Sequence, residues 1–209
     1  MIFYDCATAP SPRRARMFIA EKGLEPERRD ISIAQNQQLA PEFLAVNPQG
    51  TLPVLVTQKG LVLTENLAIA AYLEAIHPDP PLMGESATEK AEILQWSAIC
   101  ETRGGAPIAE VLRNSHPAMK GRALPGPQDV EQIPQLAERG RTRVTAFFDL
   151  LEQRLADRRY LGGARFSLAD ITGFVFVDFA RVIRTRIPEK NTATSDWYDR
   201  IAARPSAAL

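Results

Sequence analysis

The stretch APSPRRARMF, from Ala9 to Phe18, combines residue types that can hold a small anion. It contains one hydroxyl group, Ser11, between two prolines, and three arginines follow. A hydroxyl donor beside positive charge, at the start of a helix, favours the ionised form of a neighbouring acidic group. The alternative is that Ser11 only caps the helix that begins here.

A second stretch, NPQGTLPVL, places a proline inside a sequence that is otherwise typical of a strand. Proline removes a ladder donor, so Pro53 is expected at an edge or special position. A cis peptide between Leu52 and Pro53 would turn the backbone N–H and carbonyl of Leu52 outward. These two groups could then pair with an extended peptide in the manner of an added strand.

A third stretch, TENLAIAAYL, puts Glu65 and Asn66 at the N-terminus of a predicted helix. Free N–H groups and the positive end of the helix dipole favour a ligand carboxylate there. The Asn66 amide can add a hydrogen bond, and Glu65 can accept one from a ligand ammonium. Plain helix capping is the alternative for both residues, and Thr64 is a candidate N-cap.

The elements that position these residues follow the order β-α-β-α-β-β-α over the first 77 residues. MIFYDCA and PERRDISI are predicted strands, and LPVLVTQKGLVL is a predicted hairpin. Helices are predicted from Pro12, over PEFLAVNP and from Thr64. This order predicts a small mixed sheet covered by helices.

A segment rich in proline and glycine, residues 78–86, is expected to separate this domain from residues 87–209. The second part has no convincing strand and is predicted to be all-helical. A long helix from Ala87 is expected to bend at Gly104 and Gly105, and another covers 133–155. Residues 166–183 predict a helix in the middle of the core, with Ser167 and Asp170 as its capping box.

Four residues of the long helix from Ala87 are spaced by four, three and four positions, on one predicted face: Trp96, Cys100, Arg103 and Pro107. They could line a substrate pocket between the two domains, where an Arg103 guanidinium would stabilise an anionic leaving group or intermediate. The same spacing fits packing against another domain or subunit.

The composition excludes several classes of protein. Twenty-five basic residues balance twenty-five acidic ones, so we expect no nucleic-acid partner and no attraction to an anionic membrane. Two cysteines without a CxxC motif and two histidines predict no metal site, no disulfide framework and no histidine-based triad. No secretion signal or membrane-spanning run is visible, which predicts a cytoplasmic protein.

Together, the element order, NPQGTLPVL, TENLAIAAYL, the proline-rich linker and FSLADI resemble the cytosolic glutathione S-transferases over essentially the whole chain. Each motif alone is weakly specific, but their order and spacing carry the resemblance. It implies an α/β thioredoxin-like N-terminal domain, residues 1–77, and an all-α C-terminal domain, residues 87–209. It also implies a homodimer, a role in detoxification and glutathione as co-substrate.

The resemblance also implies roles for individual residues. In the family, the cis-proline motif pairs with the cysteinyl backbone of glutathione, which corresponds to Leu52 and Pro53. The pair at the third helix holds the γ-glutamyl end, which corresponds to Glu65 and Asn66, with Asn in place of the usual Ser. Thr51 lies beside the first motif and is expected to contact the tripeptide. Gln38 lies where many members bind the glycyl carboxylate.

The thiol-activating residue departs from the family pattern. Serine-type members read roughly S-P-x-S-R-x-V-R, and Ala9 occupies the first serine position here. Ser11 lies two positions on, near where members with an active cysteine or asparagine place that residue. Thr8 is a second candidate and Cys6, expected to be buried at the end of the first strand, a third. Tyr4 lies near the position of tyrosine-type members, but packing within the strand is favoured.

The leading hypothesis is attack by enzyme-bound glutathione thiolate on a small hydrophobic electrophile. Isomerase, dehalogenase and peroxidase activities remain open on the same fold, because chemistry is set by the pocket. A glutathione-binding stress or interaction protein with little transferase activity is the competing class, favoured by Ala9. A thiol–disulfide oxidoreductase that uses its own cysteines is disfavoured, although glutathione itself could supply the redox thiol.

Overall fold

A computed structural model describes all 209 residues, and the chain divides into two compact units. Unit 1 comprises residues 1–80, the short segment 125–128 and Leu209. Unit 2 comprises residues 81–124 and 129–208. The division at residues 80 and 81 falls inside the segment that the sequence predicts as a linker. None of the helices is both long and apolar enough to span a membrane.

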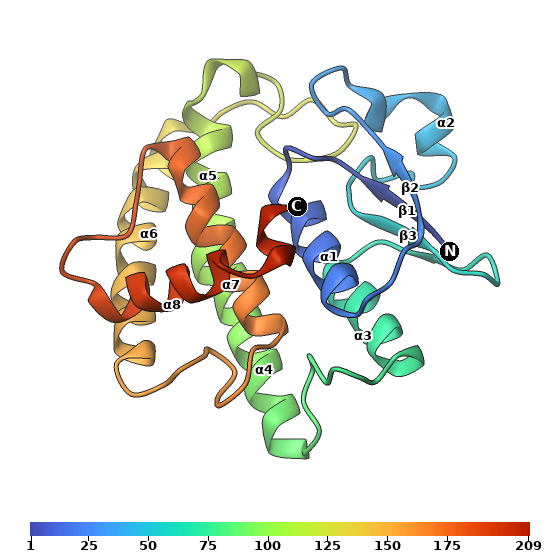
Figure 1. Cartoon of the computed structure of the whole chain (residues 1–209). Helices are drawn as coiled ribbons and strands as arrows, with labels where there is room; N and C mark the ends of the chain where they lie inside the picture. The colour runs from blue at the N-terminus through green and yellow to red at the C-terminus, as the bar shows by residue number, and fades with distance from the viewer. The chain divides into compact units, whose positions relative to one another are not determined.

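Unit 1 has the predicted order of strands and helices (Figure 1). Its elements are β1 (Ile2–Asp5), α1 (Pro10–Glu21), β2 (Glu27–Asp30), η1 (Gln37–Leu39), α2 (Pro41–Leu44), β3 (Val54–Val56), β4 (Val62–Leu63) and α3 (Asn66–Ile76). The Thr64 cap prediction is wrong, because Glu65 holds the N-cap position of α3.

The sheet has the strand order β2-β1-β3-β4. β1 pairs in parallel with β2 and antiparallel with β3, and β3 pairs antiparallel with β4. Tyr4 lies opposite Val54, and Leu55 lies opposite Leu63. The C-terminal ends of β1, β2 and β4 and the N-terminal end of β3 therefore meet at one edge of the sheet.

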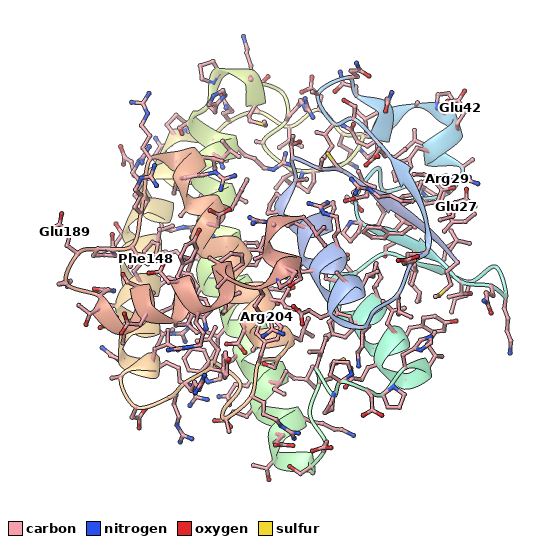
Figure 2. The ribbon with its side chains drawn as sticks, in the orientation of Figure 1. Glu27, Arg29, Glu42, Phe148, Glu189 and Arg204 are labelled. Atoms are coloured by element: carbon pink, nitrogen blue, oxygen red, sulfur yellow. The ribbon has the colours of Figure 1, made fainter.

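The two faces of the sheet carry different side chains because residues alternate along a strand. Tyr4 and Val54 pack with Phe43 of α2, and the rings of Tyr4 and Phe43 meet edge to face with centroids 5.7 Å apart. On the other face, Phe3 and Leu55 are buried, and α1 and α3 pack against each other on this side (Figure 1). The edge strand β2 is charged throughout; Figure 2 shows Glu27 beside Arg29, which donates to it.

Unit 2 consists of helices. They are α4 (Ala87–Ile99), η2 (Cys100–Gly105), α5 (Ala106–Ser115), η3 (Pro117–Met119), α6 (Pro134–Leu155), α7 (Leu168–Phe179), η4 (Ala180–Ile183), α8 (Thr192–Ala202) and η5 (Pro205–Ala208). Every residue of α7 from Leu168 to Val177 is buried, which confirms the predicted core helix. α7 packs against α4, η2 and α8.

The bend predicted at Gly104 and Gly105 takes the form of a π-helical segment, η2. A Cβ atom on Gly104 would come within 2.6 Å of the ring of Phe147, and one on Gly105 would overlap the ring of Phe176. The two glycines therefore allow aromatic rings from α6 and α7 to pack directly on the backbone of η2. Its wider turn also changes the direction of the side chains that follow.

Asp170 anchors the start of α7 and is fully buried. Its carboxylate accepts from the backbone N–H and hydroxyl of Ser167, which confirms the predicted capping box. It also accepts from the Leu161 N–H at 2.8 Å and from the Trp197 indole at 2.9 Å, so it ties three segments of unit 2 together. Burial raises the pKa of Asp170 to about 6, although these hydrogen bonds act in the opposite direction.

We expect Asp170→Ala to lower the free energy of unfolding by about 3 kcal/mol or more, because it leaves buried donors without an acceptor. Urea denaturation at pH 7.5 measures the change. Asp157→Ala is the matched control. It removes an exposed carboxylate that lies 3.9 Å from Nε of Arg158, and it should change stability by less than about 0.5 kcal/mol. A similar loss in both variants would contradict the anchoring role.

The stability difference between the wild type and Asp170→Ala should depend on pH. The pKa of Asp170 is higher in the folded chain, about 6, than the ordinary 3.8, so its proton stabilises the folded state below about pH 4. That stabilisation is lost as the pH rises through 6. The stability difference between wild type and Asp170→Ala should shrink by up to about 3 kcal/mol from pH 4 to pH 7.5. A difference that widens over this range would show that the hydrogen bonds outweigh burial.

Candidate active site

The candidate site is built at the edge of the sheet where four strand ends of unit 1 meet. Continuing the β1–β3 register by one residue places Pro53 opposite Asp5, and continuing the β3–β4 register by two residues places it opposite Glu65. The loop after β1, the start of β3 and the start of α3 are therefore neighbours. The topology brings together Thr8, Leu52 and Asn66, which are distant in sequence.

The Leu52–Pro53 peptide is cis. Sheet pairing of β3 begins at Val54, so the backbone N–H and carbonyl of Leu52 lie just before the ladder. Leu52 is half-buried, and Pro53 is buried. The cis peptide that the sequence suggested is therefore present, and the backbone of Leu52 lies at the site edge outside the β1–β3 ladder.

Asn47 braces the loop that leads into this peptide. It is 2% exposed, and its Nδ2 donates to the Thr51 carbonyl at 2.9 Å and to the Thr51 hydroxyl oxygen at 3.0 Å. Its Oδ1 accepts from the Gln49 N–H at 3.1 Å. The Thr51 hydroxyl proton remains available as a donor. Sequence reasoning missed Asn47, although an Asn that bonds the backbone two residues on is a known turn signal.

Gln38 is brought to the same loop by Gly50. Gly50 has φ +62°, and a Cβ there would approach the Leu39 side chain at 3.0 Å and the Gln38 carbonyl at 3.2 Å. The Gln38 side chain is buried, and its Oε1 has no hydrogen-bond partner. A buried amide oxygen without a partner typically costs about 1–3 kcal/mol, which a ligand donor would offset.

Glu65 and Asn66 do not cap α3. Glu65 is the N-cap residue but makes no side-chain capping bond, and it is exposed. Asn66 is 8% exposed, and its buried Oδ1 has no partner. The first intrahelical bond of this turn runs from the Ile69 N–H to the Glu65 carbonyl. The N–H groups of the first turn precede that bond, so this helix end can accept a carboxylate.

Ser11 does not cap α1 either. The N-cap residue is Ala9, which makes no side-chain capping bond, and Ser11 is the second helical residue. Pro10 and Pro12 have no N–H, and the first helical bond runs from the Arg13 N–H to the Ala9 carbonyl at 3.3 Å. Ser11 is therefore the one residue of this first turn with a backbone N–H outside the helical ladder. It offers both that N–H and its hydroxyl.

The other candidates near α1 differ in exposure. Thr8 is exposed, and its hydroxyl oxygen lies 3.5 Å from the Cys6 sulfur. Cys6 is 4% exposed, as expected for the end of the first strand. Tyr4 is buried against Phe43, and its hydroxyl accepts from Arg29, so its packing role is confirmed.

The four residues predicted on one face of the long helix differ in their surroundings. Trp96 lies under the Arg154 guanidinium, Cys100 is fully buried with its sulfur against Gly173, and Pro107 is buried. Arg103 is exposed. The π-helical turn between Cys100 and Gly105 changes the angular spacing on which the prediction relied. Cys100 is thus part of the packed interior of unit 2.

Residues 8–76 match the family model described as glutathione S-transferase, N-terminal domain, and residues 134–200 match that of the C-terminal domain. A relative from Saccharomyces cerevisiae, glutathione S-transferase 2, is 31% identical over 209 residues, covering 99% of this chain and 87% of the relative. The chain belongs to the glutathione S-transferase family. The resemblance drawn from the motifs is therefore confirmed, as is the fold.

This glutathione S-transferase is also similar to a solved structure and to a relative with a different named activity. The crystal structure of Gtt2 from Saccharomyces cerevisiae superposes with a TM-score of 0.90 at 30% identity, covering 100% of this chain and 99% of that one. The disulfide-bond oxidoreductase YfcG of Escherichia coli is 27% identical over 213 residues, covering 99% of this chain and 92% of the relative. The family therefore includes relatives with different named activities.

The loop of this transferase can be tested through Asn47. We expect Asn47→Ala to lower the free energy of unfolding by about 1–3 kcal/mol, since Thr51 and Gln49 lose their buried partner. Denaturant unfolding measures the change, and amide hydrogen exchange of residues 47–53 should become faster. Gln58→Ala, in the exposed turn between β3 and β4, is the control. Unchanged exchange of residues 47–53 would contradict the bracing role.

Proposed function

We propose that this glutathione S-transferase binds glutathione at the sheet edge of unit 1 and presents its thiolate to a small hydrophobic electrophile. The observation that carries the proposal is that Ser11, Glu65 and Asn66 make no capping bonds. Polar residues at helix N-termini ordinarily satisfy the helix itself. Here their donors and acceptors are available to a ligand.

The residues at the edge match the chemical groups of glutathione in turn. The Leu52 backbone pairs with the cysteinyl N–H and carbonyl. The N-terminus of α3 and Asn66 hold the γ-glutamyl carboxylate, and Glu65 accepts from its ammonium group. Gln38 donates to the glycyl carboxylate, and Thr51 supplies a further hydroxyl donor. The unpaired oxygens of Gln38 and Asn66 are acceptors, so they support the binding of ligand N–H groups, such as the glycyl amide and the γ-glutamyl ammonium, rather than the two carboxylate contacts.

The chemical task of the protein is to ionise the thiol. A thiol with a pKa near 8.5 is only about 3% thiolate at pH 7, and lowering the pKa to about 7 makes roughly half of it ionised. In this proposal the Ser11 hydroxyl and N–H donate to the sulfur, with Thr8 as the alternative donor. The dipole of α1 adds to the effect. The bound thiolate then attacks an electrophile held beside it.

The proposal is tested first by ultraviolet titration of the thiolate in bound glutathione. We expect the wild type to hold the apparent pKa at least one unit below that of free glutathione, and Ser11→Ala to raise it by about half to one unit. Thr8→Ala, which removes the alternative hydroxyl donor, is measured in parallel.

Two other results would assign thiol activation differently or exclude it. A depressed pKa that changes only in Thr8→Ala would make Thr8 the activating residue. Bound glutathione with an unshifted pKa would contradict thiol activation and favour a glutathione-binding protein with little transferase activity, the reading that Ala9 supports.

The reaction class needs a separate measurement. A disulfide-bond oxidoreductase is the second candidate, because a relative over nearly the whole chain carries that name and glutathione could supply the redox thiol. We expect glutathione consumption with an aryl halide, and a decrease of about three- to tenfold in Ser11→Ala below pH 7. Turnover of a small disulfide without turnover of the aryl halide would favour the second candidate. Because Cys6 and Cys100 are both buried, that activity should survive replacement of Cys100 by Ala.

We also propose that the chain forms a homodimer through the outer face of α3. Leu67 and Ile76 are 47% and 43% exposed on this helix, and Ala68, Ala71 and Ala75 are exposed between them. Apolar surface of this kind typically marks an interaction site. Light scattering should give a dimer for the wild type and a monomer for Leu67→Glu, with Leu124→Glu as the control. A wild-type monomer would contradict this assignment.

A further inference from the structure

A buried carboxylate lies at the end of β1, next to the loop that carries Thr8. Asp5, the last residue of β1, has no solvent exposure. Its Oδ1 accepts from the Cys6 N–H at 2.7 Å and from Arg16 Nη1 at 2.5 Å, and its Oδ2 lies 2.9 Å from Nε of Arg28. Burying a carboxylate is costly unless it is paired and hydrogen-bonded. Oδ2 makes no hydrogen bond, so the hydrogen-bonded unit consists of Asp5 Oδ1, the Cys6 N–H and Arg16.

Arg16 extends this unit to the loop between β1 and α1. Its side chain is 8% exposed, and its Nη2 donates to the Ala7 carbonyl at 3.5 Å and to the Leu209 carbonyl at 3.4 Å. The loop closes on itself through a bond from the Ala9 N–H to the Cys6 carbonyl at 3.1 Å. The backbone from Cys6 to Ala9 is thus held at Cys6 by Asp5, at Ala7 by Arg16 and at Ala9 by its own turn.

The held segment contains Thr8 and leads directly into Ser11. Ser11 makes no capping bond to α1, and the Thr8 hydroxyl contacts only the Cys6 sulfur of the same segment, so the placement of both residues depends on the backbone that carries them. A donor that stabilises an anion acts over hydrogen-bond distances, and a displacement of about 1 Å weakens such an interaction strongly. The planar guanidinium of Arg16 can donate to Asp5 and to the Ala7 carbonyl at the same time, whereas the ammonium group of a lysine acts as a point charge.

We propose that Asp5 and Arg16 are positioning residues that hold the segment Cys6–Ala9 so that Thr8 and Ser11 face the sulfur of bound glutathione. The inference rests on the proposed function, since it concerns the same sulfur. It assigns no contact with the ligand to either residue. Their effect reaches the sulfur through the loop backbone.

The same carboxylate provides an internal control. Arg28 approaches only Oδ2, its side chain is 44% exposed, and it also donates to Asp30. Arg28 makes no hydrogen bond to the Cys6–Ala9 segment. If the loop matters, loss of Arg16 and loss of Arg28 should have different effects although both remove a positive charge from Asp5. Simple charge balance at Asp5 would make the two losses equivalent.

The experiment compares Arg16→Lys, Arg16→Gln and Arg28→Gln with the wild type in the full chain. Arg16→Lys keeps the charge beside Asp5 and guards against loss of the fold. The readouts are the thiolate pKa of bound glutathione, the glutathione dissociation constant and the pH profile of kcat with an aryl halide. Amide hydrogen exchange of residues 6–9 without glutathione reports the loop directly.

We expect Arg16→Lys to speed exchange of residues 6–9 and to raise the thiolate pKa by about half to one unit, lowering kcat about three- to tenfold below pH 7. The decrease should vanish at pH values above the new pKa. The dissociation constant should stay within about threefold, because Leu52, Glu65 and Asn66 are untouched. Arg28→Gln should leave the pKa and the exchange unchanged.

Three results would overturn the proposal. One is a depressed wild-type pKa that Arg16→Lys leaves unchanged, which refutes positioning while the proposed function stands. Another is equal loss in Arg28→Gln, which would indicate charge balance alone. The third is a wild-type pKa equal to that of free glutathione, which refutes the proposed activation and this inference together. Exchange of residues 6–9 separates these cases, since it needs no ligand.

Discussion

The pairing of β1 with neighbours on both sides is the constraint on which the site depends. Because β1 is parallel to β2 and antiparallel to β3, the end of β1 meets the beginning of β3 and the end of β4 at one edge of the sheet. Three polar segments that are far apart in the chain thereby become neighbours. A one-residue slip between β1 and β3 would place Phe3 and Leu55 on opposite faces of the sheet and misalign these segments.

The site edge is also where the backbone is most closely controlled. Asn47 holds one loop, and the Asp5–Arg16 pair holds another, so both sides of the edge are fixed by buried polar groups. Buried polar groups are stabilising only when their partners are satisfied. Oε1 of Gln38 and Oδ1 of Asn66 are buried without a hydrogen-bond partner, as is Asp5 Oδ2, which instead has the ion pair with Arg28. A rigid frame with a few unsatisfied groups is the arrangement expected of a preorganised binding site.

Local signals in the sequence predicted much of the fold. The strand and helix order of unit 1, the buried helix α7 and the capping box of Ser167 and Asp170 all follow from hydrophobic periods and short motifs. The π-helical turn was outside the reach of such reasoning, because it depends on rings from α6 and α7 that pack on Gly104 and Gly105. For that reason the regular helical spacing assumed for Trp96, Cys100, Arg103 and Pro107 does not continue through η2. Asp5 and Arg16 were missed because a charged pair that is buried by tertiary packing has no local sequence pattern.

The two prolines around Ser11 have a consequence for ligand selectivity. Helix N-termini that bind phosphate use several backbone N–H groups, which together surround an anion with many oxygen atoms. In the first turn of α1, Pro10 and Pro12 remove two of these donors. The donors that remain in this turn are the backbone N–H and the hydroxyl of Ser11. Two donors on one residue suit an anion that accepts at one atom, as a thiolate sulfur does. The first turn of α1 thus offers fewer backbone donors than the helix N-termini that bind phosphate groups.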